Sequence, residues 1–263
     1  MIALALVAAG PSPVAAQENG AGRIVYFDPD ANHQAIVNIA TWFTDYLASA
    51  SVELVFQAVE SREAFERLLA DPKTRFALVS SSYVATADAR LDPILVPQVG
   101  GDPFYYKVLI DVGTGDGREL SGKNLAASVI AKPGSSNFKE LLQGLAAGGV
   151  RVDGVHVIPV AKDIDALLAL SFGQVQAALV TPESVEVLKR INPGVAAKFR
   201  AVYRTSPILR APMCEVGKKS SARERANLVS ALQRMSQSDD GRKAMRTMGF
   251  EGWLPFQPEM LKR

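Results

Sequence analysis

The sequence predicts an α/β fold of two lobes, each a doubly wound mixed sheet flanked by helices, joined by two crossing hinge strands. Short apolar runs alternate with amphipathic helical patterns over residues 23–79, and the alternation restarts at residue 125. The C-terminal part holds helical patterns but few strands, so it must pack on an earlier half. Two lobes linked by two crossing segments account for all three observations.

The first half begins with a strand-helix-strand-helix-strand pattern. A helix is predicted at 31–48 because Ile36, Ile39, Phe43 and Leu47 recur on one stripe of a 3.6-residue period. Such an alternation is typical of a parallel sheet in a doubly wound layer. The other elements are strands at 23–27, 52–58 and 76–79, and a helix at 61–69 that Ser61 opens and Asp71-Pro72 closes.

The second half repeats the alternation after two longer strands. These strands, at 94–99 and 105–112, flank the turn Gly100-Gly101-Asp102-Pro103. Three strands then each have a helix of their own, and Asn192-Pro193-Gly194 ends the last of these helices. The remaining elements are strands at 125–130, 155–160, 177–180, 199–203 and 213–216, and helices at 138–145, 164–172, 183–190, 222–237 and 239–248.

Two crossing segments are predicted near residues 105–107 and 203–206. They assign residues 17–105 together with 206–263 to lobe 1, and residues 106–205 to lobe 2. In such a layout a ligand sits in the cleft between the lobes, against the carboxyl ends of strands from both.

Composition and charge narrow the function classes. The 263-residue chain is 48% hydrophobic and 21% charged, which fits a soluble globular protein with an ample core. A formal net charge of +2, with scattered basic residues, argues against a nucleic acid or a membrane surface as partner. Cys214 is the single cysteine, and His33 and His156 lie far apart, so we expect no cofactor, no metal site and no catalytic residues. We expect a monomer.

The N-terminus predicts a secretory signal peptide. Residues 2–9 form a short apolar run, Gly10-Pro11-Ser12-Pro13 breaks it, and small residues end at Ala16 before a polar stretch. The run is too short to span a bilayer. We therefore expect residues 1–16 to be removed by cleavage after Ala16, which gives a periplasmic product. The alternative is a disordered N-terminal tail.

The stretch Lys132-Pro133-Gly134-Ser135-Ser136-Asn137 predicts an anion site. It lies between a predicted strand and a predicted helix, and unpaired N–H groups at a helix N-terminus favour negative charge. The hydroxyls of Ser135 and Ser136 add further donors. The alternative is an ordinary helix cap and turn.

Two other polar loops follow predicted strands. Ser80–Tyr83 would close the site from the first lobe, and Tyr83 either binds the ligand or packs under its loop. Glu183 either faces the cleft or caps its own helix. Arg210 and Lys132 are the nearest candidates for neutralising an anion. The predicted ligand-binding residues are Ser80, Ser81, Ser82, Tyr83, Ser135, Ser136, Asn137 and Glu183.

Several phrases together resemble the periplasmic solute-binding proteins of phosphate, phosphite and phosphonate ABC importers. The resemblance covers nearly the whole chain from Arg23 and implies the type II periplasmic-binding fold. Gly134-Ser-Ser-Asn-Phe138 is similar to the turn that holds the phosphonate oxygens in this family. The other phrases are Phe76-Ala-Leu-Val-Ser-Ser-Ser-Tyr-Val-Ala85, Leu120-Ser-Gly-Lys-Asn-Leu125, the segment from Ala166 to Val180, and Met248-Gly-Phe-Glu-Gly-Trp-Leu-Pro255.

The departures from the family concern the end of the ligand that carries an amino group. Two expected aromatics are Ser61 and Ser80 here, and an expected histidine is replaced by Lys162 or Asp163. The acid expected after Ser206-Pro207 is Ala211. The resemblance therefore implies an oxyanion cradle without the grip for an aminoalkyl group.

We accordingly expect the substrate-binding component of an ABC-type importer. It would capture a small solute, such as a phosphonate, phosphite, phosphate or similar oxyanion, and pass it to a membrane permease. The alternative is a periplasmic sensory or partner-docking protein that serves another ligand or a histidine kinase. An enzyme on the same scaffold is disfavoured because the sequence offers no nucleophile–base pair.

Overall fold

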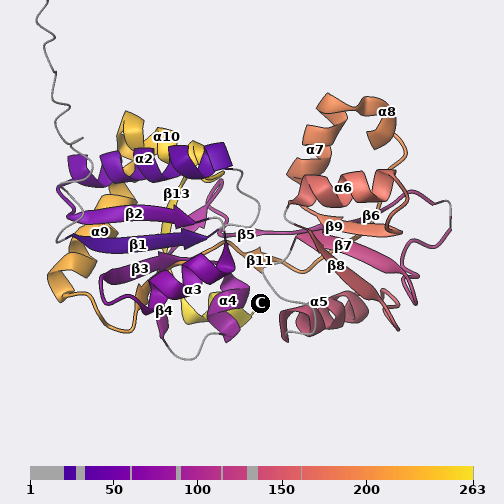
Figure 1. Cartoon of the computed structure of the whole chain (residues 1–263), viewed down its shortest axis with the longest axis horizontal. Coiled ribbons are helices and arrows are strands. Elements are labelled where there is room, and N and C mark those ends of the chain that lie inside the picture. The colour runs from indigo at the N-terminus through magenta and orange to yellow at the C-terminus, as the bar shows by residue number, and fades with distance from the viewer. Residues whose placement is uncertain are drawn as a thin grey trace, which may run out of the picture.

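Two helix-covered sheets lie next to each other along the long axis of the molecule, and thin segments connect them (Figure 1). The structure is a computed structural model of the chain. It describes residues 21–27, 33–59, 61–86, 90–113, 115–128, 136–160 and 162–262. The prediction of a signal peptide at residues 1–16 therefore lies outside the described residues.

The first lobe is built on a six-stranded mixed sheet with the strand order β13-β4-β12-β3-β1-β2. β1 (Gly22–Phe27) is parallel to β2 (Leu54–Val59) and β3 (Thr74–Leu78), whereas β12 (Met213–Val216) is antiparallel to β3 and to β4 (Leu91–Gln98). Its other elements are α2 (His33–Ser49), α3 (Arg62–Ala70), α4 (Ser81–Thr86), α9 (Ala222–Arg234), η1 (Met235–Gln237), α10 (Asp239–Thr247), β13 (Gly252–Pro255) and η2 (Pro258–Lys262).

Helices cover both faces of this sheet because its central strands are apolar on both sides. Ile24 and Tyr26 of β1 belong to a core shared with α2, α9 and α10, while Val25 and Phe27 belong to a core with α3 and α4. A strand buried on both faces is typical of parallel pairing. The C-terminal helices thus pack on the first lobe, as the sequence predicts.

The second lobe has a five-stranded mixed sheet with the order β10-β6-β9-β7-β8. β7 (Asn124–Ser128) is parallel to β8 (His156–Val160) and β9 (Ala177–Val180), while β6 (Val108–Asp111) is antiparallel to β9 and to β10 (Arg200–Arg204). Its helices are α5 (Ser136–Ala147), α6 (Asp163–Ser171), α7 (Pro182–Ile191) and α8 (Pro193–Ala196).

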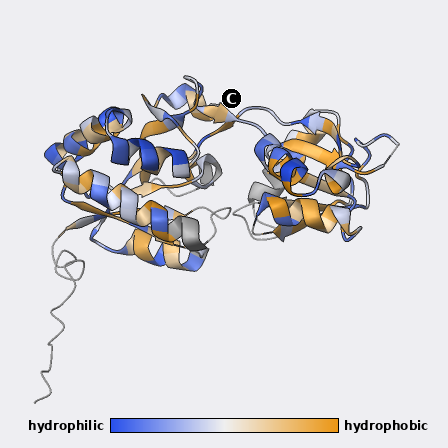
Figure 2. Cartoon of the chain, turned by 90° about the horizontal axis from the view of Figure 1, so that it is seen from above, coloured by the Kyte–Doolittle hydropathy of each residue, from blue (hydrophilic) through white to orange (hydrophobic). Residues whose placement is uncertain are grey.

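The second lobe is also doubly wound. Leu125 and Ala127 of β7 pack in a core with α5, whereas Ala126 packs in a core with α6 and α7. Apolar residues gather on the strands and on the inner faces of the helices, and polar residues lie outside (Figure 2). This arrangement places the starts of α6 and α7 at the edge of the sheet where β8 and β9 end.

A two-stranded antiparallel ribbon connects the lobes (Figure 1). β5 (Phe104–Tyr105) pairs with β11 (Ile208–Leu209), so that Tyr105 lies opposite Ile208. Tyr105 of the predicted first crossing at 105–107 lies in β5. The second strand of the ribbon, β11, lies between β10 and β12 in the chain. The assignment of residues 17–105 and 206–263 to one lobe and 106–205 to the other stays a prediction.

Most predicted elements occur within a few residues of their expected bounds. The strand expected at 105–112 is divided instead, because Tyr106 and Lys107 separate β5 from β6. The sequence did not indicate β13, which lies at the edge of the first sheet and carries Trp253 against Phe250, with the ring centroids 4.9 Å apart. Across the described ranges, no helix combines the length and the apolar character needed to cross a membrane.

Candidate ligand-binding site

The carboxyl ends of the parallel strands β7, β8 and β9 lie at one edge of the second sheet. Ser128 ends β7, Asp163 opens α6 after β8, and Thr181 follows β9 as the N-cap of α7. Parallel neighbours end at the same edge, which is where doubly wound sheets bind ligands. Ser128 and Thr181, which are 53 positions apart in the sequence, are therefore brought to the same edge of the sheet.

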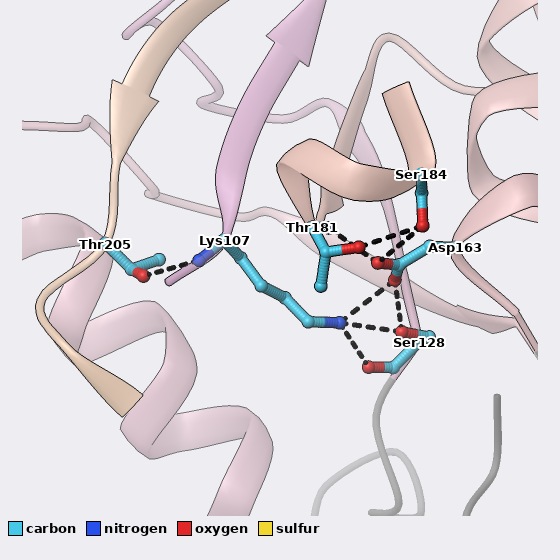
Figure 3. A network of polar contacts seen from close by, with 6 residues as sticks. All are labelled: Lys107, Ser128, Asp163, Thr181, Ser184 and Thr205. Atoms are coloured by element: carbon cyan, nitrogen blue, oxygen red, sulfur yellow. Dashed lines mark hydrogen bonds and ion pairs between the residues drawn. The ribbon is translucent and has the colours of Figure 1, made fainter. Parts of the chain in front are cut away.

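A buried network of polar contacts occupies this edge (Figure 3). The Lys107 Nζ donates to the Ser128 carbonyl oxygen at 3.0 Å, to Ser128 Oγ at 2.7 Å and to Asp163 Oδ1 at 3.0 Å. Ser128 Oγ also donates to Asp163 Oδ1. An ammonium group has three donors, so all those of Lys107 are used within the protein.

The charges of Lys107 and Asp163 neutralise each other away from water. Their side chains are only 9% and 4% exposed. Burial raises the pKa of Asp163, but the charge of Lys107 and the hydrogen bonds from Ser128, Thr181 and Lys107 outweigh burial, so this pKa lies below its usual value. The aspartate is ionised and holds Lys107 in place.

The Asp163 carboxylate also binds at the N-terminus of α7. Its Oδ2 accepts from the Thr181 backbone N–H at 2.5 Å and from Ser184 Oγ at 3.4 Å, and Thr181 Oγ1 lies 2.8 Å from Ser184 Oγ. The start of α7 is an anion-binding position by its dipole and free N–H groups. In this protein its own carboxylate occupies that position.

The predicted cradle at Ser135, Ser136 and Asn137 is described only in part. Ser136 and Asn137 are the first two residues of α5, which starts two residues before the predicted start at 138, and the anion site stays a prediction. Ser135 and Lys132 lie outside the described residues, as do the side chains of Ser136 and Asn137. No acidic residue is present in the first turn of α5, in contrast to α6 and α7.

Glu183 lies apart from this network. It is exposed in the first turn of α7, where its charge is favourable to the helix dipole. None of the described hydrogen bonds or ion pairs joins it to Asp163 or Lys107. The N-cap of α7 is Thr181, so Glu183 is a first-turn residue, and its place beside the ligand stays a prediction.

In the first lobe, the loop after β3 is held by its own chain. Ser80 Oγ accepts from the Tyr83 backbone N–H at 3.3 Å, and the Tyr83 ring packs edge-on against Phe65, with 5.4 Å between the ring centroids. Ser81 Oγ donates to the carbonyl oxygen of Leu209 in β11 at 2.9 Å. The Tyr83 ring thus lies against α3, while Ser81 connects α4 to the ribbon between the lobes. A contact of Tyr83 with the ligand stays a prediction. Ser82 lies in α4, and its side chain is outside the described part.

The ribbon is reinforced by contacts across its two segments. The Lys107 N–H donates to Thr205 Oγ1 at 3.0 Å, and the Thr205 N–H donates to the Lys107 carbonyl oxygen at 2.9 Å. The Arg204 guanidinium lies 3.4 Å from the centroid of the Tyr106 ring. Lys107 consequently joins the ribbon through its backbone and the site through its side chain.

The departures seen in the sequence have structural roles of their own. Ser61 caps α3, with its Oγ accepting from the Ala64 N–H at 3.1 Å, and Ala211 packs against the core of the first lobe. His156 is exposed on the edge strand β8, and burial raises the pKa of the Cys214 thiol. Among the described residues, no group of three potential metal ligands comes together.

The sequence matches the family described as "ABC transporter, phosphonate, periplasmic substrate-binding protein" over residues 25–261. A binding protein component of an ABC phosphonate transporter from Pseudomonas aeruginosa has 14% identity and a TM-score of 0.68, with 92% of this chain and 83% of that chain covered. PhnD1 from Prochlorococcus marinus, in complex with methylphosphonate, has 12% identity and a TM-score of 0.69, with 93% and 96% covered.

A histidine kinase sensor domain with similarity to periplasmic binding proteins has 14% identity and a TM-score of 0.53, with 88% of this chain and 97% of that chain covered. No curated protein matches the sequence. At these identities the structural likeness shows a shared fold, the two-lobe fold that the sequence predicts.

Proposed function

Since the chain belongs to the family of periplasmic substrate-binding proteins of phosphonate ABC transporters, we propose that it captures a small phosphonate, or a related oxyanion such as phosphite or phosphate, between its lobes. The start of α5 would hold the oxyanion through backbone N–H groups and the hydroxyls of Ser135 and Ser136. Ser80 to Tyr83 would face the ligand from the first lobe.

One observation carries this proposal. The Asp163 carboxylate occupies the start of α7, and the first turn of α6 carries two acidic residues, Asp163 and Asp165, which disfavour an external anion there. α5 has no acidic residue in its first turn, so none of its own carboxylates competes there for an anion. A ligand oxyanion would therefore bind at α5.

The same contacts disfavour an aminoalkyl group on the ligand. An ammonium group needs an acidic partner, and Asp163 is already saturated by Lys107, Ser128 and Thr181. At the position where the family resemblance implies an acid, Ala211 packs on the core instead. Glu183 would be the remaining carboxylate of this edge, and its exposure leaves it poorly placed for a buried contact.

After capture, the ribbon of β5 and β11 would act as the hinge on which the lobes close. The protein would then deliver its ligand to a membrane permease, as a monomer in the periplasm after cleavage following Ala16. Closure requires no covalent step, in keeping with a transport component rather than an enzyme.

A calorimetric titration of the purified protein with methylphosphonate, phosphite, phosphate and sulfate tests the proposal. At least one phosphorus oxyanion should bind, and at about a hundred times its Kd it should stabilise the fold by about 2.7 kcal/mol. Replacement of Ser135 and Ser136 by Ala should weaken binding about ten- to a hundredfold. The control Ser236→Ala alters an exposed hydroxyl on η1 and should leave the affinity unchanged. The absence of binding to any of these anions would refute the proposal.

A sensory role is the second candidate, because a histidine kinase sensor domain shares the fold with a TM-score of 0.53. Capture would be the same, and the partner would be a kinase or another periplasmic protein in place of the permease. Reconstitution with the permease and ATPase of a phosphonate ABC transporter distinguishes the two, since only a transport component stimulates ligand-dependent ATP hydrolysis.

A further inference from the structure

Lys107 lies at the point where the ribbon enters the second lobe. On one side of it β5 pairs with β11, and on the other side Val108 of β6 pairs with Arg204 of β10. Between these pairings, the Lys107 N–H donates to Thr205 Oγ1 at 3.0 Å, and the Thr205 N–H donates to the Lys107 carbonyl oxygen at 2.9 Å. The backbone of Lys107 therefore belongs to the junction between the ribbon and the second lobe.

The side chain of Lys107 reaches across the second sheet. β9 lies between β6 and β7 in the strand order, yet the Lys107 Nζ, from just before β6, bonds to Ser128 at the end of β7. Asp163, which the same amine contacts at 3.0 Å, accepts from the Thr181 backbone N–H directly after β9. One ion pair thus connects the ribbon junction to the ends of β7 and β9 and to the starts of α6 and α7.

A movement of the ribbon relative to the second lobe would have to break this pair. Lys107 and Asp163 are both buried, so their separated charges would lie in the protein interior without a partner. An uncompensated buried charge is strongly unfavourable, and Ser128 Oγ would lose two bonds at the same time. The Arg204 guanidinium, 3.4 Å from the centroid of the Tyr106 ring, adds a second contact between the two segments of the junction. This junction is therefore stiff.

The junction of the ribbon with the first lobe is held differently. The Arg210 N–H donates to the Pro103 carbonyl oxygen at 2.9 Å, and Ser81 Oγ donates to the Leu209 carbonyl oxygen at 2.9 Å from a part-exposed position. Within the described ranges, no ion pair joins this junction. A neutral hydrogen bond that opens to water loses little, because water replaces the partner. The first-lobe junction is therefore the easier one to bend.

We infer that the Lys107–Asp163 pair clamps the ribbon to the second lobe, so that these two parts move as one rigid body and the lobes bend where the ribbon joins the first lobe. This inference rests on the proposed function and deepens it, because it locates the closure that follows capture. The strands that form the carboxyl edge of the second sheet stay attached to the ribbon during that movement.

Distances between pairs of spin labels in the ligand-free protein test the inference. Ser206→Cys, Gln174→Cys and Gln233→Cys place labels at exposed positions of the ribbon, the second lobe and the first lobe, and buried Cys214 should stay unlabelled. Double electron–electron resonance should give a narrow distance distribution between ribbon and second lobe, and a broader one between ribbon and first lobe.

Removal of the clamp should abolish this difference. Lys107→Met combined with Asp163→Leu replaces both charges by apolar groups of similar size, a change that folded proteins often tolerate. The distribution between ribbon and second lobe should widen to about the width found between ribbon and first lobe. Ser128→Ala keeps both charges and should widen it less, and this variant decides the test if the double variant does not fold.

Arg200→Met combined with Asp111→Leu is the matched control. It removes another ion pair of the second lobe, at the ends of β6 and β10 that lie away from the ribbon, and should leave the narrow distribution unchanged.

Equal widths for the two label pairs in the unaltered protein would overturn the inference. An unchanged narrow distribution in the double variant, or in Ser128→Ala where the double variant does not fold, would do the same, as would equal widening in the control. None of these measurements uses a ligand, so such a result leaves the proposed capture of an oxyanion standing. Absence of anion binding in the calorimetric titration would instead refute the proposed function and leave the measured widths unaffected.

Discussion

Each lobe buries a carboxylate, and the two carboxylates differ in how far their cationic partners are exposed to water. Asp163 lies at the carboxyl edge of the second sheet with a cation that is only 9% exposed. Glu215 lies within β12 of the first sheet, accepts from Ser220 Oγ at 2.7 Å, and pairs at 3.2 Å with Arg225, whose side chain is 44% exposed. A buried acid with a water-exposed cation is inexpensive to maintain. A fully buried ion pair costs more to maintain, because both charges lose their contact with water.

The largest difference in the free energy of unfolding should appear between variants in which Asp163 or Glu215 is neutralised. Asp163→Asn leaves the Lys107 charge buried and uncompensated, and should lower the free energy of unfolding by about 3–5 kcal/mol. Glu215→Gln leaves an arginine that can turn to solvent, and should cost about 1–2 kcal/mol after allowance for solvent screening. Urea denaturation measures both. Equal losses would erase the distinction between the two lobes.

The pH dependence of stability should show the same pair. The pKa of Asp163 is lowered in the folded protein, so the unfolded chain binds a proton more readily. Its contribution is therefore fully present above its ordinary value of 3.8 and is lost as the pH falls through the lowered folded value. Asp163→Asn should flatten the acid side of the stability curve measured between pH 2 and 6. An unchanged acid slope would contradict the assigned direction.

A smaller difference in stability is expected for the loss of the serine hydroxyls that bind the two carboxylates. Ser128→Ala removes bonds to both Lys107 and Asp163 inside the protein, and should cost about 1–3 kcal/mol. Ser220→Ala removes one bond to Glu215 at a half-buried position, and should cost about 1 kcal/mol. Thermal unfolding of the two variants gives the comparison. A larger loss for Ser220→Ala would place the more demanding network in the first lobe.

The smallest net change in the free energy of unfolding should follow when Lys107 and Asp163 are replaced together. Lys107→Met combined with Asp163→Leu replaces two charges by apolar groups of similar size, and such replacements are often neutral for stability. We expect a free energy of unfolding within about 1 kcal/mol of the unaltered protein, far from the loss for Asp163→Asn. Ligand binding should still be impaired, because Ser128 and Thr181 lose their shared partner. A double variant as unstable as Asp163→Asn would refute the strain attributed to the unpaired lysine.

Much of the fold was accessible from the sequence because its signals are local. The burial of Ile39, Phe43 and Leu47 on one side of α2, the capping of α3 by Ser61 and the bounds of β12 are all confirmed. β13 escaped notice because Gly252-Trp253-Leu254-Pro255 is too short for a period and is a strand only by its pairing with β4. The same holds for β5 and β11, whose two residues each acquire their structure from each other.

The candidate site was accessible only in outline. The start of α5 followed from a strand, a polar turn and a helix in sequence. Lys107 and Ser128 were not singled out, because their partner Asp163 is 56 and 35 positions away and no local pattern announces the contact. In the sequence, Asp163 stands out only as one of the residues at the position of an expected histidine. The contact of Tyr83 with Phe65 joins positions 18 residues apart, so no local pattern indicates it.

Lys107 has a mechanical consequence. Its amide and carbonyl bind Thr205 beside the β5–β11 ribbon, while its amine binds Ser128, the last residue of β7. If the ribbon acts as the hinge that we propose, a ligand that displaces the end of β7 would also pull on the connection between the lobes. The strength of the contacts of this one lysine would then govern how much of the binding energy is used for closure.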